Sequence, residues 1–453
     1  CTPCLHNSLI RLVYNRTIML ITWWHYLIVF AVAFIVTVAA VPLVRRIAIS
    51  HGIVDQPSAR RVNKEPIPRL GGVAMYLGLL TALVVEYVCE LAGFWPGPFS
   101  LFMGSGVNMV GVTVGLSIVV VVGVVDDVQS LRPGVKFLGQ IVAAVVIASS
   151  GVLMSGFKMP LSDGHIVLGW LSYPITVIYL VALANIINLI DGLDGLAAGI
   201  TGISALGLFA LTVTLVRNDA SIVAIALIAV CVAFLFYNFH PASIFMGDSG
   251  SLLLGMTLGA ISLMGATRFS SITALAVPIL IAGVPVIDTA SAILRRLLNH
   301  QPIQQADRGH VHHRLLDQGF SQRKAVLIIY AWTAVLTLGG IFVWNMGGLV
   351  KYTVLFALLA ASAFIVFKLQ LLGPVLEHHY FPDIFRRPRG KATPVQAEQP
   401  AGQPDRPADP LAAGDDDDPL AAAIANAQVG ELVCSIDGGH PDALGVREDR
   451  DEQ

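Results

Sequence analysis

The chain has 453 residues, of which 55% are hydrophobic and 13% charged, and its formal net charge is −2. Soluble globular proteins carry roughly 25% charged residues, so this composition excludes an ordinary water-soluble protein and indicates a bilayer as the solvent. The sequence has no basic domain, which argues against a nucleic-acid partner. The five cysteines lack the spacing of a zinc site.

Long apolar runs follow one another along most of the chain. A helix needs about 20 mostly apolar residues to cross a hydrocarbon core of roughly 30 Å. Eleven runs of this kind can be read from the sequence: residues 24–44, 71–92, 106–125, 136–151, 169–188, 195–216, 221–238, 248–265, 272–293, 325–346 and 350–371. We therefore predict an all-α polytopic membrane protein with about eleven transmembrane helices, in a membrane domain of residues 24–372.

Basic residues are unevenly distributed between the predicted loops. The connections after the first, third and ninth runs are rich in Lys and Arg, whereas 93–105, 266–271 and 346–350 nearly lack them. Cytoplasmic loops carry the excess of positive charge. The basic loops are thus predicted to face the cytoplasm, with the N-terminal segment 1–23 outside and the C-terminus inside. Met19, just before the first run, is a candidate translation start.

Two segments do not fit the helical pattern. Residues 152–168 interrupt it, and Asp163-Gly164 is a good hairpin turn, so a small external β-hairpin is predicted there. From residue 388 the chain becomes rich in Pro, Ala, Gln and Asp, with four aspartates in a row at Asp415–Asp418. Such a composition cannot bury enough apolar surface to fold. We expect 388–453 to be a disordered acidic cytoplasmic tail.

Acidic and histidine residues gather in four short segments at the ends of the predicted helices. All four fall on the same side of the membrane, and they contain Asp126 and Asp127; Asp191 and Asp194; Asp248; and His310, His312 and His313. Each alone has a structural alternative: interfacial charge, a capping turn, a helix N-cap or a solvated loop. Together they indicate an assembled site, because carboxylates at a membrane edge are costly unless they are paired or coordinate a cation.

This set of residues suits phosphate chemistry. Mg²⁺ is usually held by one or two protein carboxylates together with substrate phosphates. Arg and Lys neutralise phosphate oxygens, and phosphoryl transfer depends mainly on positioning and electrostatic stabilisation. The sequence contains no Walker A, G-x-G-x-x-G or kinase signature. It therefore favours a Mg²⁺-dependent site, with Mn²⁺ as the alternative ion, that acts on phosphate groups.

Five separated strings carry a family resemblance that covers residues 30–330. They are PIPRLGG (66–72), VVGVVDD (121–127), NIINLIDGLDGLAAG (185–199), FLFYNFHPASIFMGDSGSLLLG (234–255) and DRGHVHH (307–313). They resemble the polyprenyl-phosphate N-acetylhexosamine-1-phosphate transferases of glycosyltransferase family 4, the superfamily that includes phospho-N-acetylmuramoyl-pentapeptide transferase. One departure is Asn63, where related sequences often have His.

The resemblance implies a multi-pass bacterial inner-membrane enzyme whose catalytic helices form a cytoplasmic cleft. It implies transfer of N-acetylhexosamine-1-phosphate from a UDP-sugar to a polyprenyl phosphate, with release of UMP. INLIDGLDGLAAG and HVHH are similar to the branch that uses UDP-N-acetylglucosamine and undecaprenyl phosphate and begins O-antigen, common-antigen or teichoic-acid glycans. Whether the enzyme forms a homodimer is left open.

The resemblance also implies roles for individual residues. Mg²⁺ ligands are implied at Asn188 and Asp248. One of the paired acids, Asp126 or Asp127, is implied to take the proton of the lipid phosphate. Asp191, Gly192 and Asp194 match the uridine-side loop, and Asp191 also joins the catalytic set with His312 and His313 of the loop that closes over the diphosphate. The remaining residues bind the substrate: Lys64, Asn238, Phe245, Arg308 and His310.

Two other classes of function remain open at this point. A secondary transporter also carries intramembrane acids, but its substrate site lies near the bilayer midplane, whereas these acids lie at predicted helix ends. A catalytically silent scaffold for glycan assembly is the other alternative. All four segments described above contain acids, the fourth in the string DRGHVHH, and this argues against a silent scaffold.

Overall fold

The computed structural model describes residues 2–55, 66–95, 106–158, 165–215, 217–266, 283–298, 311–346 and 350–368. Several predicted features lie outside these residues: the hairpin turn at Asp163-Gly164, the site residues Lys64, Arg308 and His310, and the tail 388–453.

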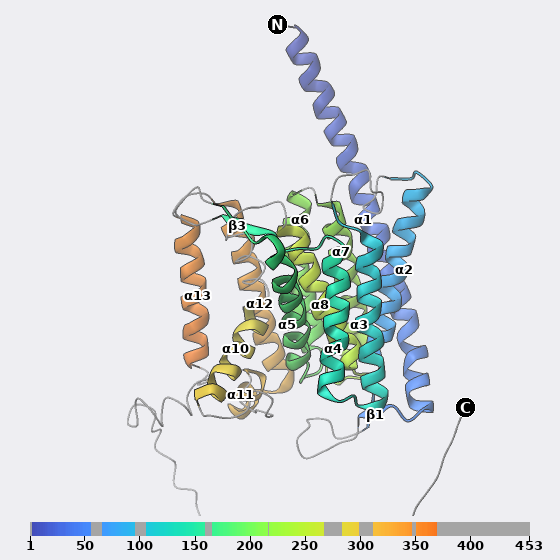
Figure 1. Cartoon of the computed structure of the whole chain (residues 1–453), viewed down its shortest axis with the longest axis vertical. Helices are drawn as coiled ribbons and strands as arrows, with labels where there is room; N and C mark the ends of the chain where they lie inside the picture. The colour runs from blue at the N-terminus through green and yellow to red at the C-terminus, as the bar shows by residue number, and fades with distance from the viewer. Residues whose placement is uncertain are drawn as a thin grey trace, which may run out of the picture. The chain divides into compact units, whose positions relative to one another are not determined.

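The described residues form a bundle of helices that run alongside one another (Figure 1). In chain order these are α1 (Thr2–Ser50), α2 (Gly71–Leu91), α3 (Met109–Gln129), α4 (Pro133–Ser149), α5 (Ser172–Ile190), α6 (Leu196–Thr214), α7 (Asn218–Asn238), α8 (Gly247–Ala266), α10 (Gly283–Leu298), α11 (Val311–Asp317), α12 (Gln322–Asn345) and α13 (Val350–Lys368), with a 3₁₀ turn η2 (Gly169–Leu171) before α5. The prediction of an all-α polytopic protein is confirmed.

Seven of the described helical stretches are long and apolar enough to cross a membrane. They are Trp23–Ser50, Gly71–Leu91, Met109–Gln129, Gly169–Ile190, Leu196–Thr214, Asn218–Asn238 and Gln322–Asn345. Helices α4 and α13 contain shorter apolar stretches. The predicted run 272–293 is described only from Gly283, so the count of eleven and the orientation in the membrane stay predictions.

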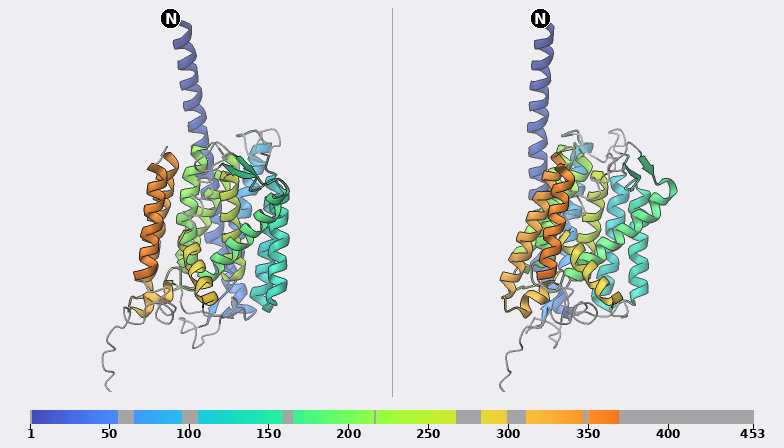
Figure 2. Two further views of the ribbon diagram at one scale, coloured as in Figure 1. Left: turned by 60° about the vertical axis from the view of Figure 1, so that its left-hand side comes forward. Right: turned by 90° about the vertical axis from the view of Figure 1, so that its left-hand side faces the viewer.

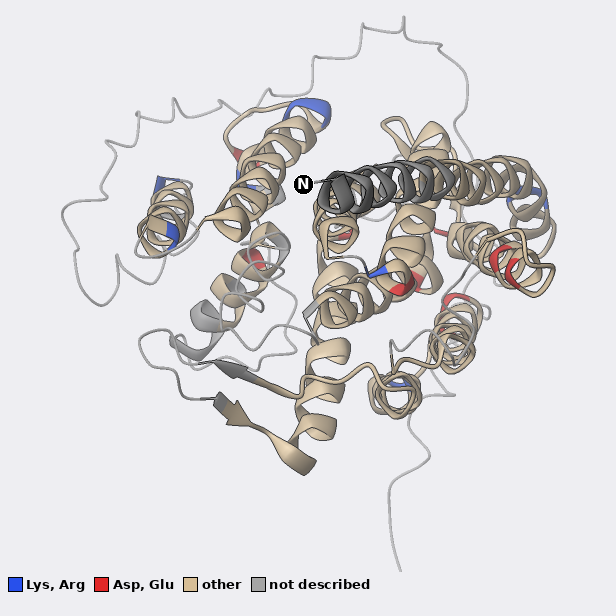
Figure 3. Ribbon diagram, turned by 90° about the horizontal axis from the view of Figure 1, so that it is seen from above, with Lys and Arg blue, Asp and Glu red and all other residues tan. Residues whose placement is uncertain are grey.

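Burial divides the helices into inner and outer ones. The apolar windows of α6 and α7 are 78% and 72% buried, against 28% for α1. Almost every residue of α8 is buried, although the helix is of membrane-spanning length. Large apolar side chains such as Leu27, Ile35 and Leu43 are exposed on α1, as expected for a surface in contact with lipid. Figure 3 shows how few charged residues the described helices carry.

Two small antiparallel ribbons connect the helices. Strand β3 (Gly156–Lys158) pairs with β4 (His165–Val167), which confirms the predicted hairpin. It lies at the end of the bundle opposite α11 (Figures 1 and 2). At the other end, β1 (Val54–Asp55) pairs with β2 (Ile67–Pro68), a contact that the sequence did not predict.

The backbones of α2 and α3 pack directly against the backbone at the start of α8, because glycines lie where these helices cross. A Cβ added at Gly72 would overlap the backbone of Ser249 and Gly250, and one at Gly123 would overlap the backbone of Ser249. The backbone amide of Gly72 also donates to the Met246 carbonyl at 2.8 Å. Small residues at these positions let the three helices meet, as is common in membrane bundles.

We expect Gly72→Val to destabilise the protein by about 1–3 kcal/mol or more, since the added methyl groups meet backbone and not a flexible side chain. Thermal unfolding in detergent measures the loss. Gly134→Ala is the matched control, because a Cβ at that position meets nothing within 4 Å. Equal unfolding temperatures for the two variants would contradict the packing described here.

Candidate active site at one end of the bundle

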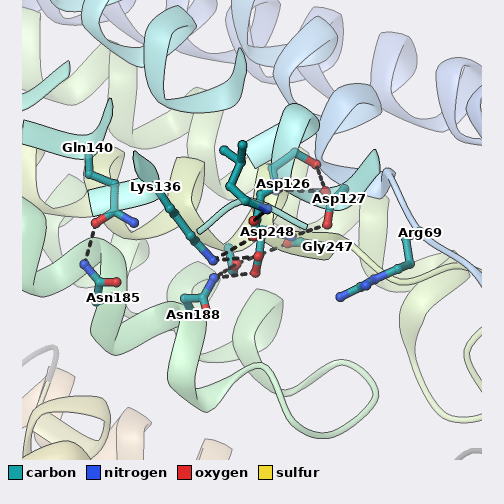
Figure 4. Close-up of polar contacts among 12 residues, drawn as sticks. Arg69, Asp126, Asp127, Lys136, Gln140, Asn185, Asn188, Gly247 and Asp248 are labelled. Atoms are coloured by element: carbon teal, nitrogen blue, oxygen red, sulfur yellow. Dashed lines mark hydrogen bonds and ion pairs between the residues drawn. The ribbon is translucent and has the colours of Figure 1, made fainter. Parts of the chain in front are cut away.

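The predicted acids meet at one end of the bundle, although they come from distant parts of the chain. Asp126 and Asp127 lie in the last turn of α3, Asp191 directly follows α5, and Asp248 lies in the first turn of α8. Figure 4 shows Asp126, Asp127 and Asp248 side by side, with Lys136 and Asn188 turned towards them. Three of the four predicted segments therefore lie together, and the histidine side chains of the fourth lie outside the described residues.

Asp127 caps the start of α8. Its Oδ1 accepts from the Asp248 backbone amide at 2.8 Å. Its Oδ2 accepts from the backbone amide of Ser249 at 3.0 Å and from the Ser249 hydroxyl at 2.8 Å. The carboxylate is 8% exposed, and Gly247, at φ 69°, leaves room for it, because a Cβ there would overlap Asp127. Asp127 therefore supplies the acceptor that an N-cap residue would otherwise provide.

Asp126 and Asp248 share one ammonium group. Lys136, in the first turn of α4, places Nζ 3.1 Å from Asp126 Oδ2 and 2.6 Å from Asp248 Oδ2. The other oxygen of Asp126 accepts from the Leu131 amide at 2.7 Å. These three side chains are only 11–22% exposed, so the ion pairs are weakly screened. The lysine offsets the repulsion between two carboxylates that face the same space.

Asn188 completes the oxygen-rich face of this cluster. Its Nδ2 donates to Asp248 Oδ1 at 2.6 Å and to the Ser251 hydroxyl at 3.1 Å. The nitrogen of the amide thus faces Asp248, and a half-turn of the amide would present the oxygen in its place. Further along the same side of α5, Asn185 Nδ2 donates to Gln140 Oε1 at 2.6 Å and ties α5 to α4.

We tested whether these residues fit the magnesium ion that the sequence predicts. Within the described part of the chain, no three His, Cys, Asp or Glu side chains are placed to hold a metal by themselves. Mg²⁺ needs only one or two carboxylates when phosphate oxygens supply the rest. Asp248, Asp126 and the Asn188 amide offer hard oxygen donors, and the Lys136 ammonium already shows that a cation is stabilised between the two acids. The donor set fits Mg²⁺.

Asp191 lies near enough to Asp248, Asp127 and Asp194 for their charges to act on it. It forms the C-cap of α5 and is partly buried. Burial raises the pKa of its carboxyl to about 7, and the nearby charges of Asp248 and Asp127 act in the same direction. The guanidinium of Arg69 opposes this rise in pKa, and Figure 4 shows it directed towards the acidic cluster. Asp191 is therefore poised to exchange a proton near neutral pH.

The predicted uridine-side loop is joined to the segment after α7. Asn238, 2% exposed, accepts from the Gly195 amide at 3.0 Å and donates to the Ile244 carbonyl at 3.0 Å. Asp194 Oδ2 lies 2.7 Å from His240 Nδ1. The Phe245 backbone pairs with Pro68 and Gly71, and its side chain is partly exposed. Asn238 thus holds two loops together, a role the sequence did not indicate.

The other predicted site residues are placed less fully. Gly192 is exposed in the loop between α5 and α6. His312 and His313 belong to α11, whose first amide, that of Val311, donates to Asp288 Oδ1 at 2.9 Å. The side chains of His312 and His313, and all of Lys64, Arg308 and His310, lie outside the described residues.

Three residues of the site were missed from the sequence: Lys136, Arg69 and His240. In the sequence Lys136 counts only among the basic residues of the connection after the third apolar run, which orient the protein in the membrane. Arg69 and His240 lie inside two of the family-like strings, PIPRLGG and YNFHPASIF. Only the fold shows that both lie close to the acids.

Comparison with known proteins identifies the family. The family model described as glycosyl transferase family 4 matches residues 109–266, which include α3 to α8 and the acids above. A protein of Bacillus subtilis, named a probable undecaprenyl-phosphate N-acetylglucosaminyl 1-phosphate transferase, is 39% identical over 66% of this chain and 80% of its own length. The chain belongs to glycosyl transferase family 4.

Two further relatives represent different members of the family. The decaprenyl-phosphate N-acetylglucosaminephosphotransferase of Mycolicibacterium smegmatis is 38% identical over 68% of this chain and 79% of its own length. The phospho-N-acetylmuramoyl-pentapeptide-transferase of Desulforudis audaxviator is 32% identical over 71% of this chain and 98% of its own length. The resemblance stated from the five strings is confirmed.

The raised pKa of Asp191 predicts how stability depends on pH. The folded state binds the Asp191 proton more tightly than the unfolded state, whose carboxyl has its ordinary pKa of 3.8. The contribution of this group to stability therefore falls as pH rises from about 4 to 7. We expect the stability of Asp191→Asn relative to the parent to be greater at pH 8 than at pH 5 by roughly 1–2 kcal/mol.

Thermal unfolding in detergent with EDTA, at both pH values, measures this difference. EDTA removes divalent cations that would otherwise favour the ionised carboxylate. A stability gain that is the same at pH 5 and pH 8 would show that the Asp191 carboxyl does not titrate in this interval.

Proposed function

We propose that this protein transfers N-acetylglucosamine-1-phosphate from UDP-N-acetylglucosamine to a polyprenyl phosphate, with undecaprenyl phosphate as the expected acceptor. The product is a lipid-linked sugar that begins a cell-surface glycan, and UMP is released. The observation that carries the proposal is the shared ammonium of Lys136 between Asp126 and Asp248 at one end of a membrane bundle. The names of the two more similar relatives described above support N-acetylglucosamine as the sugar.

The reaction needs one bond exchange at phosphorus. An oxygen of the lipid phosphate attacks the β-phosphorus of the UDP-sugar, the bond to the bridging oxygen breaks, and UMP leaves with that electron pair. Lys136 and Arg69 supply positive charge to the phosphate oxygens. Asp248, with Asp126 and Asn188, would hold Mg²⁺, which when bound neutralises charge on the diphosphate. We place the site on the cytoplasmic face, where the basic loops are predicted.

The contacts of the paired acids support different roles for them. Within the described part of the chain, the hydrogen bonds of the Asp127 carboxylate join it to Asp248 and Ser249 in the first turn of α8, which supports a role in holding that helix. Asp126 instead faces Lys136 and, through it, Asp248. We assign the contact with the lipid phosphate to Asp126. Because a phosphomonoester is already largely ionised near pH 7, orientation and charge balance are its main contribution.

The first test uses detergent-purified protein, undecaprenyl phosphate and radiolabelled UDP-N-acetylglucosamine. We expect Mg²⁺-dependent transfer of label to the lipid with release of UMP, loss of transfer in EDTA, and a decrease of at least ~10³-fold for Asp248→Ala, because both a charge and the predicted metal ligand are removed. Decaprenyl phosphate and UDP-N-acetylgalactosamine are run in parallel. Release of UDP in place of UMP would contradict sugar-1-phosphate transfer.

The lysine is tested by Lys136→Met, which keeps the length of the side chain and removes its charge. We expect the rate to fall by about 10²–10³-fold, since Asp126 and Asp248 then repel each other and the phosphate loses a cation. Lys136→Arg, which keeps the charge, should retain more activity than Lys136→Met. Equal activity of both variants would contradict an electrostatic role, provided both unfold at the parent's temperature.

A further inference from the structure

His240 lies beside the site but takes no part in the proposed bond exchange at phosphorus. It follows α7 directly, and its Nδ1 lies 2.7 Å from Asp194 Oδ2. The Ala242 amide donates to the same oxygen at 3.1 Å. One oxygen of the Asp194 carboxylate is thus bound by two donors from the segment after α7.

The hydrogen bond determines which ring nitrogen carries the proton. An ionised carboxylate only accepts hydrogen bonds, so Nδ1 of His240 is the donor. The His240 side chain is 37% exposed, while that of Asp194 is 13% exposed. The imidazole therefore covers Asp194 on one side, and the remaining ring nitrogen, Nε2, is not needed for this contact. Histidines that hold a functional carboxylate or ligand in place commonly use one ring nitrogen in this way.

The backbone of His240 is itself held in place. Its carbonyl accepts from Arg323 Nε, at the start of α12, at 3.1 Å. Two residues earlier, Asn238 accepts from the Gly195 amide, one residue after Asp194. The loop between α5 and α6 is thus held at two adjacent points, and among the described residues the imidazole of His240 is the side-chain donor to Asp194. Without it, the carboxylate keeps one backbone hydrogen bond and can rotate.

We propose that His240 is a positioning residue for the UDP-sugar: its Nδ1–H holds Asp194 in the orientation that the uridine side of the substrate requires. The proposal rests on the proposed function, because Asp194 belongs to the loop expected at the nucleotide. A held carboxylate binds its ligand without first losing side-chain freedom, so loss of the imidazole weakens nucleotide binding and leaves the chemical step unchanged.

Three substitutions separate this role from a merely structural one. His240→Asn places an amide donor near the position of Nδ1, His240→Gln places one near Nε2, and His240→Ala removes both. We expect KM for UDP-N-acetylglucosamine to rise about tenfold in the Gln and Ala variants, as for loss of one charge-assisted hydrogen bond, and to stay within about threefold in His240→Asn. Both kcat and the KM for the lipid should stay within about twofold of the parent.

A double substitution tests whether His240 acts through Asp194. Adding His240→Ala to Asp194→Ala should cause no further rise in KM, because the group that the imidazole positions is already absent. The proposal is wrong if the two effects multiply. It is also wrong if His240→Gln preserves KM and His240→Asn does not, or if kcat falls at constant KM.

A measurement of nucleotide binding keeps the test of His240 separate from the test of the transferase reaction. The increase in unfolding temperature caused by UMP or UDP-N-acetylglucosamine is measured for the parent and all variants, with unliganded unfolding as the folding control. If the parent binds nucleotide but transfers nothing, the proposed function fails while His240 is still tested by the loss of that increase. If neither UMP nor the UDP-sugar stabilises the parent, both proposals are wrong.

Discussion

The contact between Asp127 and the start of α8 is the one on which the geometry of the site depends. A buried carboxylate is costly unless each oxygen finds donors, and here two backbone amides and a hydroxyl supply them. The same bonds satisfy amides that the first turn of a helix leaves without partners. Because Asp248 provides one of these amides, fixing the helix also fixes the side chain that faces Lys136.

The need of the Asp127 carboxylate for donors from α8 also requires α3 to lie close to α8. The Asp127 carboxylate reaches the amides of α8 only because Gly123 and Gly247 have no side chain in the way. Gly247 also has φ 69°, a backbone conformation that favours glycine. The string FMGDSGS therefore combines a turn, a helix start and an acid within a few residues. Its chemistry and its packing cannot be changed independently.

The charges at this end of the bundle show why the proposed phosphate site would need a cation. Asp126, Asp127, Asp191 and Asp248 lie close together, and carboxylates alone would repel a diphosphate. Lys136 offsets part of this charge, and Arg69 acts electrostatically on Asp191. In the proposed function the acids would hold a metal ion and the two basic residues would face phosphate oxygens, which would let an anionic substrate bind where acids predominate.

Much of the fold could be predicted from the sequence, because its signals are local. Apolar runs indicated the spans, Asp163-Gly164 indicated the hairpin between β3 and β4, and acids at helix ends indicated where the site lies. Contacts between distant segments could not be read in this way. Lys136 lies 112 residues before its partner Asp248, and no periodicity relates the two positions. The pairing of β1 with β2 is also too short to leave a pattern.

The sequence alone does not show whether a motif residue stabilises the structure of the site or takes part in its chemistry. The contacts seen in the fold distinguish these two roles. Asn238 lies in a family-like string and was expected to line the nucleotide, yet both ends of its amide bind backbone. Asp127 and Asp126 are adjacent, yet one caps α8 and the other faces a lysine. A motif match identifies the family because both kinds of residue contribute to it. In the proposed function the reaction depends on residues whose polar atoms are not committed to holding the fold, and of the paired acids we assign that role to Asp126.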